Sequence, residues 1–128
     1  MPTEDDFPIT VYHNPACGTS RNVVAMIEAA GYAPTVVEYL KIGWTRPQLE
    51  GLFAAMGTRP REAMRQNAPQ VETLDLLNPA TGDAAIFQAM VEHPILVNRP
   101  IVVTPKGTRL ARPADRVREL LDRQPPTG

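Results

Sequence analysis

The chain has 128 residues, of which 43% are hydrophobic and 21% charged, with a formal net charge of −1 at pH 7. A chain of this length and composition forms one globular domain that buries a core without disulfides. The near-zero net charge gives no sign of nucleic-acid or membrane binding, and no apolar run approaches the roughly 18 residues that a membrane span needs. We therefore expect no nucleic-acid partner and no membrane partner.

The single cysteine, Cys17, cannot form a disulfide within the chain. One cysteine fits a reducing compartment, and no other cysteine is available to complete a zinc site. Residues 1–6 are acidic and lack the hydrophobic stretch of a signal peptide. We therefore expect a cytoplasmic protein without a bound metal or cofactor. No apolar patch for pairing is evident, so we expect a monomer.

The first third of the chain predicts two strands joined by a helix. Residues 7–12 are apolar and rich in β-branched side chains, which indicates a buried strand. Residues 18–30 show the apolar spacing of an amphipathic helix, and Gly31 stands where a C-cap glycine is expected. Residues 35–40 predict a second strand.

The middle of the chain predicts helices. Thr45 and Gln48 have the spacing of a capping box before an apolar stripe that ends at Gly57. Residues 61–67 predict a short helix, and residues 83–92 predict another with one apolar face.

The last third predicts a hairpin and a helix. Residues 101–104 and 108–111 form two strands across a turn at 105–107, and Pro113 opens the last helix. The predicted order is β-α-β-α-α-α-β-β-α, in which two strands separated by one helix pair in parallel. We therefore expect an α/β fold: a thioredoxin-like mixed sheet with a helical insertion in the middle, in a single domain spanning 1–128.

Cys17 lies between the first predicted strand and the first predicted helix, in the stretch HNPACGTSRN. A thiol attacks as the thiolate, and a free cysteine with a pKa of about 8.5 is mostly protonated at neutral pH. The unpaired N–H groups and the dipole at the start of a helix favour an anion, and they also bind oxyanions. Gly18 lets a ligand approach the backbone, and Thr19 and Ser20 offer hydroxyl groups. This loop could supply both a nucleophile and an anion site.

Each of these residues also has a structural interpretation. Cys17 could be an inert buried cysteine. His13 could stabilise a thiolate four residues later, or it could be a hydrogen-bonded structural histidine. Ser20 could serve the thiolate, or it could bond only within the first helical turn. The Asn14-Pro15 pair in the same stretch is a turn signal.

Three arginines stand apart from the others. Arg65 lies in the predicted short helix, Arg99 precedes a proline and an apolar strand, and Arg112 follows the hairpin. Composition does not show that these three converge, and surface ion pairs are the alternative for each. The arginines of the last helix alternate with acidic residues, which is typical of a solvent-exposed face.

Three blocks of the sequence resemble the glutaredoxin-linked arsenate reductases. They are HNPACGTSRN, REAMRQN and HPILVNRPIVVTPKGTRLARP, and the resemblance runs from about residue 9 to residue 121. It implies a thioredoxin-like fold with a helical insertion. It also implies that Cys17 attacks arsenate, and that Arg65, Arg99 and Arg112 hold the oxyanion and the thiol-bound arsenic.

The resemblance implies roles for two further residues and for two partners. His13 is expected to lower the pKa of the cysteine, and Ser20 to assist the thiolate. Because one cysteine cannot resolve its own adduct, glutathione is expected to react with the cysteine-bound arsenic and glutaredoxin to reduce the mixed species. The fold also implies a cis peptide bond between Arg99 and Pro100.

Other thiol proteins compete with this interpretation. Phosphatase-like arsenate reductases need an arginine six residues after the cysteine, where this chain has Val23. A dithiol oxidoreductase needs CxxC, but the fourth position here is Ser20. An Spx-type transcription regulator, or a thiol protein of this fold that does not reduce arsenate, stays open. The missing second cysteine and the three arginines favour the reductase.

Overall fold

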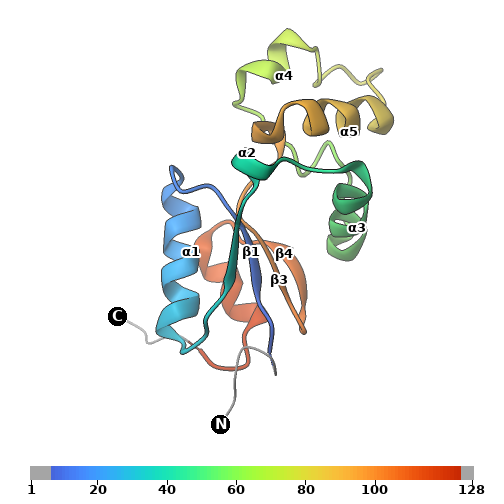
Figure 1. The fold of residues 1–128 in the computed structure, drawn as a ribbon. Helices are drawn as coiled ribbons and strands as arrows, with labels where there is room; N and C mark the ends of the chain where they lie inside the picture. The colour runs from blue at the N-terminus through green and yellow to red at the C-terminus, as the bar shows by residue number, and fades with distance from the viewer. Residues whose placement is uncertain (1–6, 125–128) are drawn as a thin grey trace. The chain divides into compact units, whose positions relative to one another are not determined.

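The computed structural model describes residues 7–124, so the acidic segment 1–6 and the end of the predicted tail at 125–128 lie outside the described residues. The chain divides into two compact units (Figure 1). The first comprises Met1–Glu38 and Arg99–Gly128, and the second comprises Tyr39–Asn98. That the whole chain acts as one thioredoxin-like domain stays a prediction.

A four-stranded mixed sheet forms the centre of the first unit. The chain runs through β1 (Thr10–His13), α1 (Gly18–Ala29) and β2 (Thr35–Glu38), then returns as β3 (Ile101–Thr104) and β4 (Gly107–Leu110). The sheet order is β2-β1-β3-β4. β1 pairs with β2 in parallel across α1, whereas β3 is antiparallel to both β1 and β4. This confirms the predicted α/β class with a mixed sheet.

The core of the first unit lies between one face of the sheet and two helices. Val11 and Val102 are register partners on β1 and β3, and both are fully buried. They share one hydrophobic cluster with α1 and with the 3₁₀ helix η2 (Ala114–Leu120), and these two helices contact each other. The helical members of this cluster are Val23, Ile27, Val117 and Leu120. Burial of this apolar surface fixes the helices against the strands that carry the loops described below.

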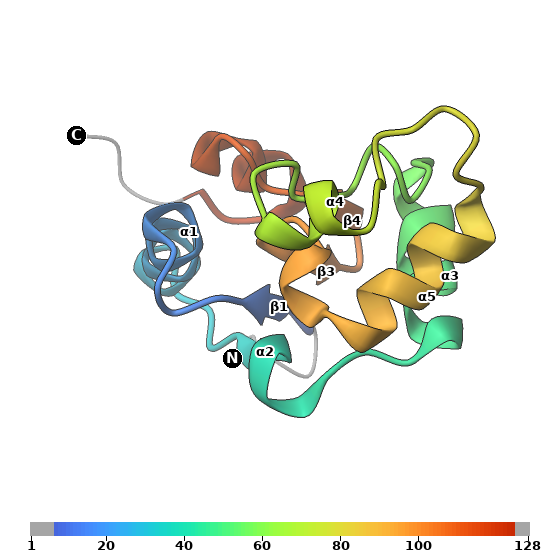
Figure 2. The same cartoon turned by 90° about the horizontal axis from the view of Figure 1, so that it is seen from above.

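The second unit is helical. It contains α2 (Tyr39–Ile42), α3 (Arg46–Met56), α4 (Pro69–Thr73), α5 (Asp83–Glu92) and the 3₁₀ helix η1 (Pro94–Leu96). Figure 2 shows α3 and α5 side by side, in agreement with the contacts between them. The helical insertion predicted for the middle of the chain is therefore confirmed.

Local sequence signals explain where α3 begins and ends. The Thr45 hydroxyl accepts a hydrogen bond from Gln48 N, and the Gln48 side chain accepts one from Thr45 N, so the predicted capping box is present. Gly57 ends the helix in the left-handed conformation, with φ of 65°. The helix packs on α5 through the rings of Phe53 and Phe87, whose centroids are 5.7 Å apart.

The short helix predicted for residues 61–67 is wrong. This segment forms turns and an isolated bridge instead. Arg65 N donates to Leu96 O at 2.7 Å, and Asn98 N donates to Ala63 O at 2.8 Å. Backbone groups that a helix would pair locally are thus paired with a distant segment, and tertiary hydrogen bonds override the helical pattern.

Smaller differences concern the ends of elements. β2 ends at Glu38, two residues earlier than predicted, because Tyr39 begins α2 and donates its hydroxyl hydrogen to Val97 O at 3.3 Å. β4 begins and ends one residue earlier than predicted, and the helix after Pro113 is a 3₁₀ helix. Across residues 7–124, no helix has the length and apolar character needed to cross a bilayer.

Candidate active site around Cys17

Three chain segments meet at one edge of the sheet in the first unit. Cys17 follows β1, Arg99 precedes β3, and Arg112 follows β4. Because β3 is antiparallel to both neighbours, the end of β1, the start of β3 and the end of β4 lie at the same edge. The Nη1 atom of Arg112 lies 3.6 Å from Cys17 Sγ and 3.2 Å from Arg99 O. The topology therefore brings together residues that are up to 95 positions apart.

The bonds from Arg99 to Pro100 and from Arg112 to Pro113 are both cis. The first confirms the prediction made for this position, and the second was not predicted.

Cys17 is the N-cap residue of α1, with an extended backbone (φ −96°, ψ 122°). Its thiol is buried, with 8% of the residue exposed. The first intrahelical hydrogen bond runs from Arg21 N to Cys17 O at 3.0 Å. The N–H groups of Gly18 and Thr19 precede that bond, so they belong to the set that a helix leaves for an external acceptor. This is the arrangement that suits an oxyanion beside a thiolate.

The surroundings of Cys17 stabilise its ionised form. Burial is the largest single effect and raises the pKa of the thiol, but four other effects outweigh it. Hydrogen bonding by the Ser20 backbone N–H, the charge of Arg99, the guanidinium of Arg112 and the Ser20 hydroxyl together lower the pKa to about 7. The thiol is therefore ionised to a much larger extent at neutral pH than a free cysteine is. Three residues predicted for the site, Ser20, Arg99 and Arg112, act on the predicted nucleophile.

His13 is the last residue of β1 and the register partner of Glu38 on β2. Burial lowers the pKa of His13; the Glu38 carboxylate opposes this effect and the charge of Arg21 adds to it. Within residues 7–124, no hydrogen-bond partner meets the buried Nδ1 atom. His13 is not among the groups that shift the pKa of Cys17. Its predicted role toward the cysteine stays a prediction.

Gly18 and Thr19 are the first two residues of α1. A Cβ atom added at Gly18 would lie 3.7 Å from Arg21 Nη2, which is an ordinary contact. The protein itself therefore leaves room for a side chain there, and any need for glycine would come from a bound ligand. The substrate-binding roles expected for these two residues stay predictions.

Arg65 belongs to the second unit, where a neighbouring side chain holds its guanidinium. Its Nε donates to Asn67 Oδ1 at 3.1 Å, while its backbone N–H is bonded to Leu96 O. Arg65 is half-buried. The backbone of Arg65 is thus held by the bond to Leu96, whereas its guanidinium makes an exposed contact with Asn67, and its predicted contact with the oxyanion stays a prediction.

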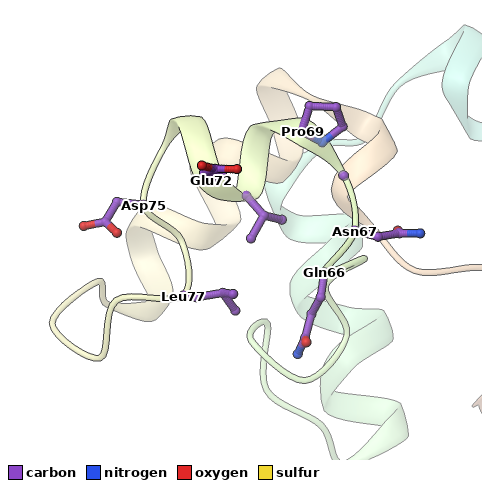
Figure 3. A pocket seen from close by; sticks show the side chains of 8 residues that line it. Gln66, Asn67, Pro69, Glu72, Asp75 and Leu77 are labelled. Carbon is purple, nitrogen blue, oxygen red and sulfur yellow. The ribbon is translucent and has the colours of Figure 1, made fainter.

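A pocket of about 520 Å³ follows Arg65 along the chain (Figure 3). Its lining comes from residues 66–77 and contains none of the predicted site residues; the lining residues are Gln66, Asn67, Ala68, Pro69, Val71, Glu72, Asp75 and Leu77. The lining includes two exposed acidic residues, Glu72 and Asp75. These charges repel an oxyanion, so the pocket does not resemble the anion site beside Cys17.

Two residues of the Cys17 loop matter more than the sequence suggested. The sequence marks Asn14 only as part of a turn signal, yet it is buried and makes three hydrogen bonds. The Nη1 atom of Arg21 donates to Pro15 O at 2.8 Å. The Asn14-Pro15 pair is the one signal in the sequence that pointed to a fixed loop conformation.

No cluster of three or more histidine, cysteine or acidic side chains suited to a metal ion occurs in the described part of the chain. The chemistry available at this edge of the sheet is that of an activated thiol beside two guanidinium groups. Such a site is suited to bind a tetrahedral oxyanion and to attack its central atom.

Comparison with known proteins agrees with this chemistry. The model of the ArsC family matches residues 12–120. Arsenate reductase ArsI2 of Synechocystis sp. is 60% identical over 117 residues, covering 91% of this chain and 84% of the relative. The arsenate reductase of Escherichia coli K12 is 50% identical over 113 residues, covering 88% of this chain and 80% of the relative. The solved arsenate reductase of Vibrio cholerae has 37% identity and a TM-score of 0.86, covering 90% of this chain and 98% of that chain. The chain therefore belongs to the ArsC family.

Proposed function

We propose that the chain is an arsenate reductase, which forms arsenite from arsenate through the thiolate of Cys17 and serves arsenic detoxification. The observation that carries this proposal is a single thiol with a pKa lowered to about 7, within 3.6 Å of the Arg112 guanidinium. The relatives named arsenate reductase, at 50% and 60% identity over most of the chain, support the same substrate.

The first chemical step is attack by Cys17 Sγ on the arsenic atom of arsenate. A sulfur–arsenic bond forms and an arsenic–oxygen bond breaks, and the departing oxygen leaves as water after taking up protons. Arg99 and Arg112 offset the negative charge of the oxyanion, which would otherwise repel the thiolate. Arg65 is proposed to bind the oxyanion as a third arginine. The N–H groups of Gly18 and Thr19, with the Thr19 hydroxyl, are proposed to bind its oxygens.

The second stage needs two electrons, because arsenic passes from the +5 to the +3 state. This chain has one cysteine and cannot supply a second thiol. Glutathione is proposed to attack the arsenic adduct as a co-substrate, and glutaredoxin to reduce the mixed species. The two thiols together give up two electrons and leave as a mixed disulfide. Water then hydrolyses the sulfur–arsenic bond, so that arsenite departs with the oxygen of that water and Cys17 returns to the thiolate.

The setting of this reaction is also part of the proposal. We propose a cytoplasmic monomer that binds neither nucleic acid nor membranes and uses no resident cofactor. The support is the single cysteine, which suits a reducing compartment, and the net charge of −1.

The test is to measure arsenite formed from arsenate by the purified protein with glutathione and glutaredoxin, and then with each omitted in turn. Arsenite formation that needs both thiol donors is the expected result. Arsenite formation with glutathione alone would remove glutaredoxin from the scheme. If no combination forms arsenite, the thiol serves another purpose, such as that of an Spx-type regulator.

A further inference from the structure

Asn14 is a buried polar residue next to the cysteine loop, and the chemistry described so far assigns it no role. It is 5% exposed and lies three residues before Cys17. From its contacts we propose that Asn14 is the positioning residue of the Cys17 thiolate, acting through the loop backbone and through Ser20. This inference deepens the proposed function and rests on it for the chemistry that the thiolate performs.

The side chain of Asn14 fixes the loop that carries the cysteine. Its Oδ1 atom accepts a hydrogen bond from Ala16 N at 2.9 Å, two residues on. The backbone carbonyl of the same residue accepts one from Cys17 N at 3.0 Å. The first bond closes the turn that lets the second one form, so the position of Cys17 depends on an acceptor in the Asn14 side chain.

The backbone N–H of Asn14 contacts Ser20, which follows Cys17 in the sequence. It donates to Ser20 Oγ at 3.4 Å. Ser20 is fully buried, so bulk water does not compete for its hydroxyl. The Asn14 N–H occupies one lone pair of Ser20 Oγ, which leaves the serine hydroxyl free to donate its own hydrogen to Cys17 Sγ. In such a chain of hydrogen bonds, the bond from Asn14 to Ser20 strengthens the bond from Ser20 to the thiolate. The lowering effect of the Ser20 hydroxyl on the pKa of Cys17 agrees with this direction.

A second hydrogen bond that holds the same loop is exposed and therefore weaker. Arg21 Nη1 donates to Pro15 O at 2.8 Å, but the bond lies at the surface, where water replaces it at little cost. The Asn14 contacts are buried or half-buried, so removal of the side chain leaves the Ala16 N–H without its partner. The asparagine, rather than the arginine, is thus the residue that holds the loop.

The experiment is the pH dependence of Cys17 alkylation by iodoacetamide, which needs neither arsenate nor a thiol donor. The variants are N14A, which removes the acceptor, N14S, which offers a shorter neutral acceptor, and N22A as control. Asn22 has the same side chain, lies on α1 and is exposed. Urea unfolding of each variant is measured first, so that a loss of fold is recognised separately.

We expect N14A to raise the apparent pKa of Cys17 by about one pH unit, which lowers the thiolate fraction at pH 7 about fivefold. N14S is expected to fall between N14A and the unchanged protein, and N22A to titrate as the unchanged protein does. The double variant N14A/S20A tests the route. N14A keeps the backbone N–H of residue 14 but loosens the turn that aims it at Ser20. If Asn14 acts partly through Ser20, the pKa shift of the double variant is smaller than the sum of the two single shifts.

An N14A protein that folds and still titrates near pH 7 would overturn the inference. If N14A does not fold, N14S decides the question, and an unshifted titration in N14S overturns it in the same way. A raised pKa in N14A together with no arsenite from any form of the protein would leave the positioning role in place and remove the proposed function.

Discussion

The two units of the chain contribute unequally to thiol chemistry. In the first unit, Cys17 has its serine and two arginines within reach, and their combined effect sets its pKa. The second unit supplies one predicted site residue, Arg65, whose guanidinium is bonded to Asn67. Activation of the thiol is thus complete within one unit, whereas the second unit is expected to act on the substrate. The two tasks can be separated by experiment.

The largest effect is expected from Cys17→Ser. A serine hydroxyl is not ionised at neutral pH, so arsenite formation should fall to the level without enzyme. The measurement is arsenite produced with glutathione and glutaredoxin, together with circular dichroism to verify that the fold is intact. Arsenite production retained by this variant would mean that the first unit does not contain the nucleophile.

Arg99→Ala should lower turnover by about 10²–10³-fold, because it removes a charge that stabilises both the thiolate and the bound oxyanion. The matched control is Arg118→Ala on η2, where the arginine pairs with Asp115 at 3.8 Å near the surface. Steady-state kinetics with arsenate compares the two. Equal losses in both variants would show that Arg99 is an ordinary surface charge.

The variant Arg65→Ala tests whether the second unit acts on the substrate without taking part in activation of the thiol. Loss of one charge-assisted contact should lower kcat/KM for arsenate by about 10–100-fold. The pKa of Cys17 should stay near 7, because Arg65 is not among the groups that shift it. Arg59→Ala is the control from the same unit, since Arg59 is exposed and pairs with Asp83. A raised Cys17 pKa in Arg65→Ala would show that the second unit takes part in activation.

The smallest effect is expected from Ser20→Ala, and it concerns the pH profile. The serine hydroxyl lowers the pKa of Cys17, so its removal should move that pKa above 7. The rate of alkylation then falls at pH 7 and recovers at higher pH, where both proteins are ionised. The profile of the unchanged protein should rise through about pH 7 and level off above it. Identical profiles for the two proteins would remove Ser20 from the activation of the thiol.

Much of the fold could be predicted because its signals are local. The capping box at Thr45, the glycine at Gly57 and the apolar stripe of α5 each depend on residues within a few positions. The segment 61–67 could not be predicted in this way. Its hydrogen bonds go to residues 96–98, and a pattern within seven residues contains no information about so distant a partner.

The same distinction holds for the candidate site. The loop HNPACGTSRN carries its own turn signal and helix start, so Cys17 and Ser20 could be identified as neighbours. The approach of Arg112 to Cys17 depends on the order of β1, β3 and β4, and the resemblance to a family, rather than composition, suggested it. The contacts of Asn14 could not be inferred, because they depend on backbone geometry that one turn signal does not specify.

The lone thiol, with its lowered pKa, has a consequence for the protein under oxidative stress. A thiolate is the form that peroxide attacks, and its first product is a sulfenic acid. Many redox proteins trap that product as an internal disulfide, but this chain has no second cysteine to do so. Protection against irreversible oxidation therefore has to come from a thiol in solution. Without such a thiol, oxidation beyond the sulfenic acid would inactivate Cys17 permanently, and not only for one turnover.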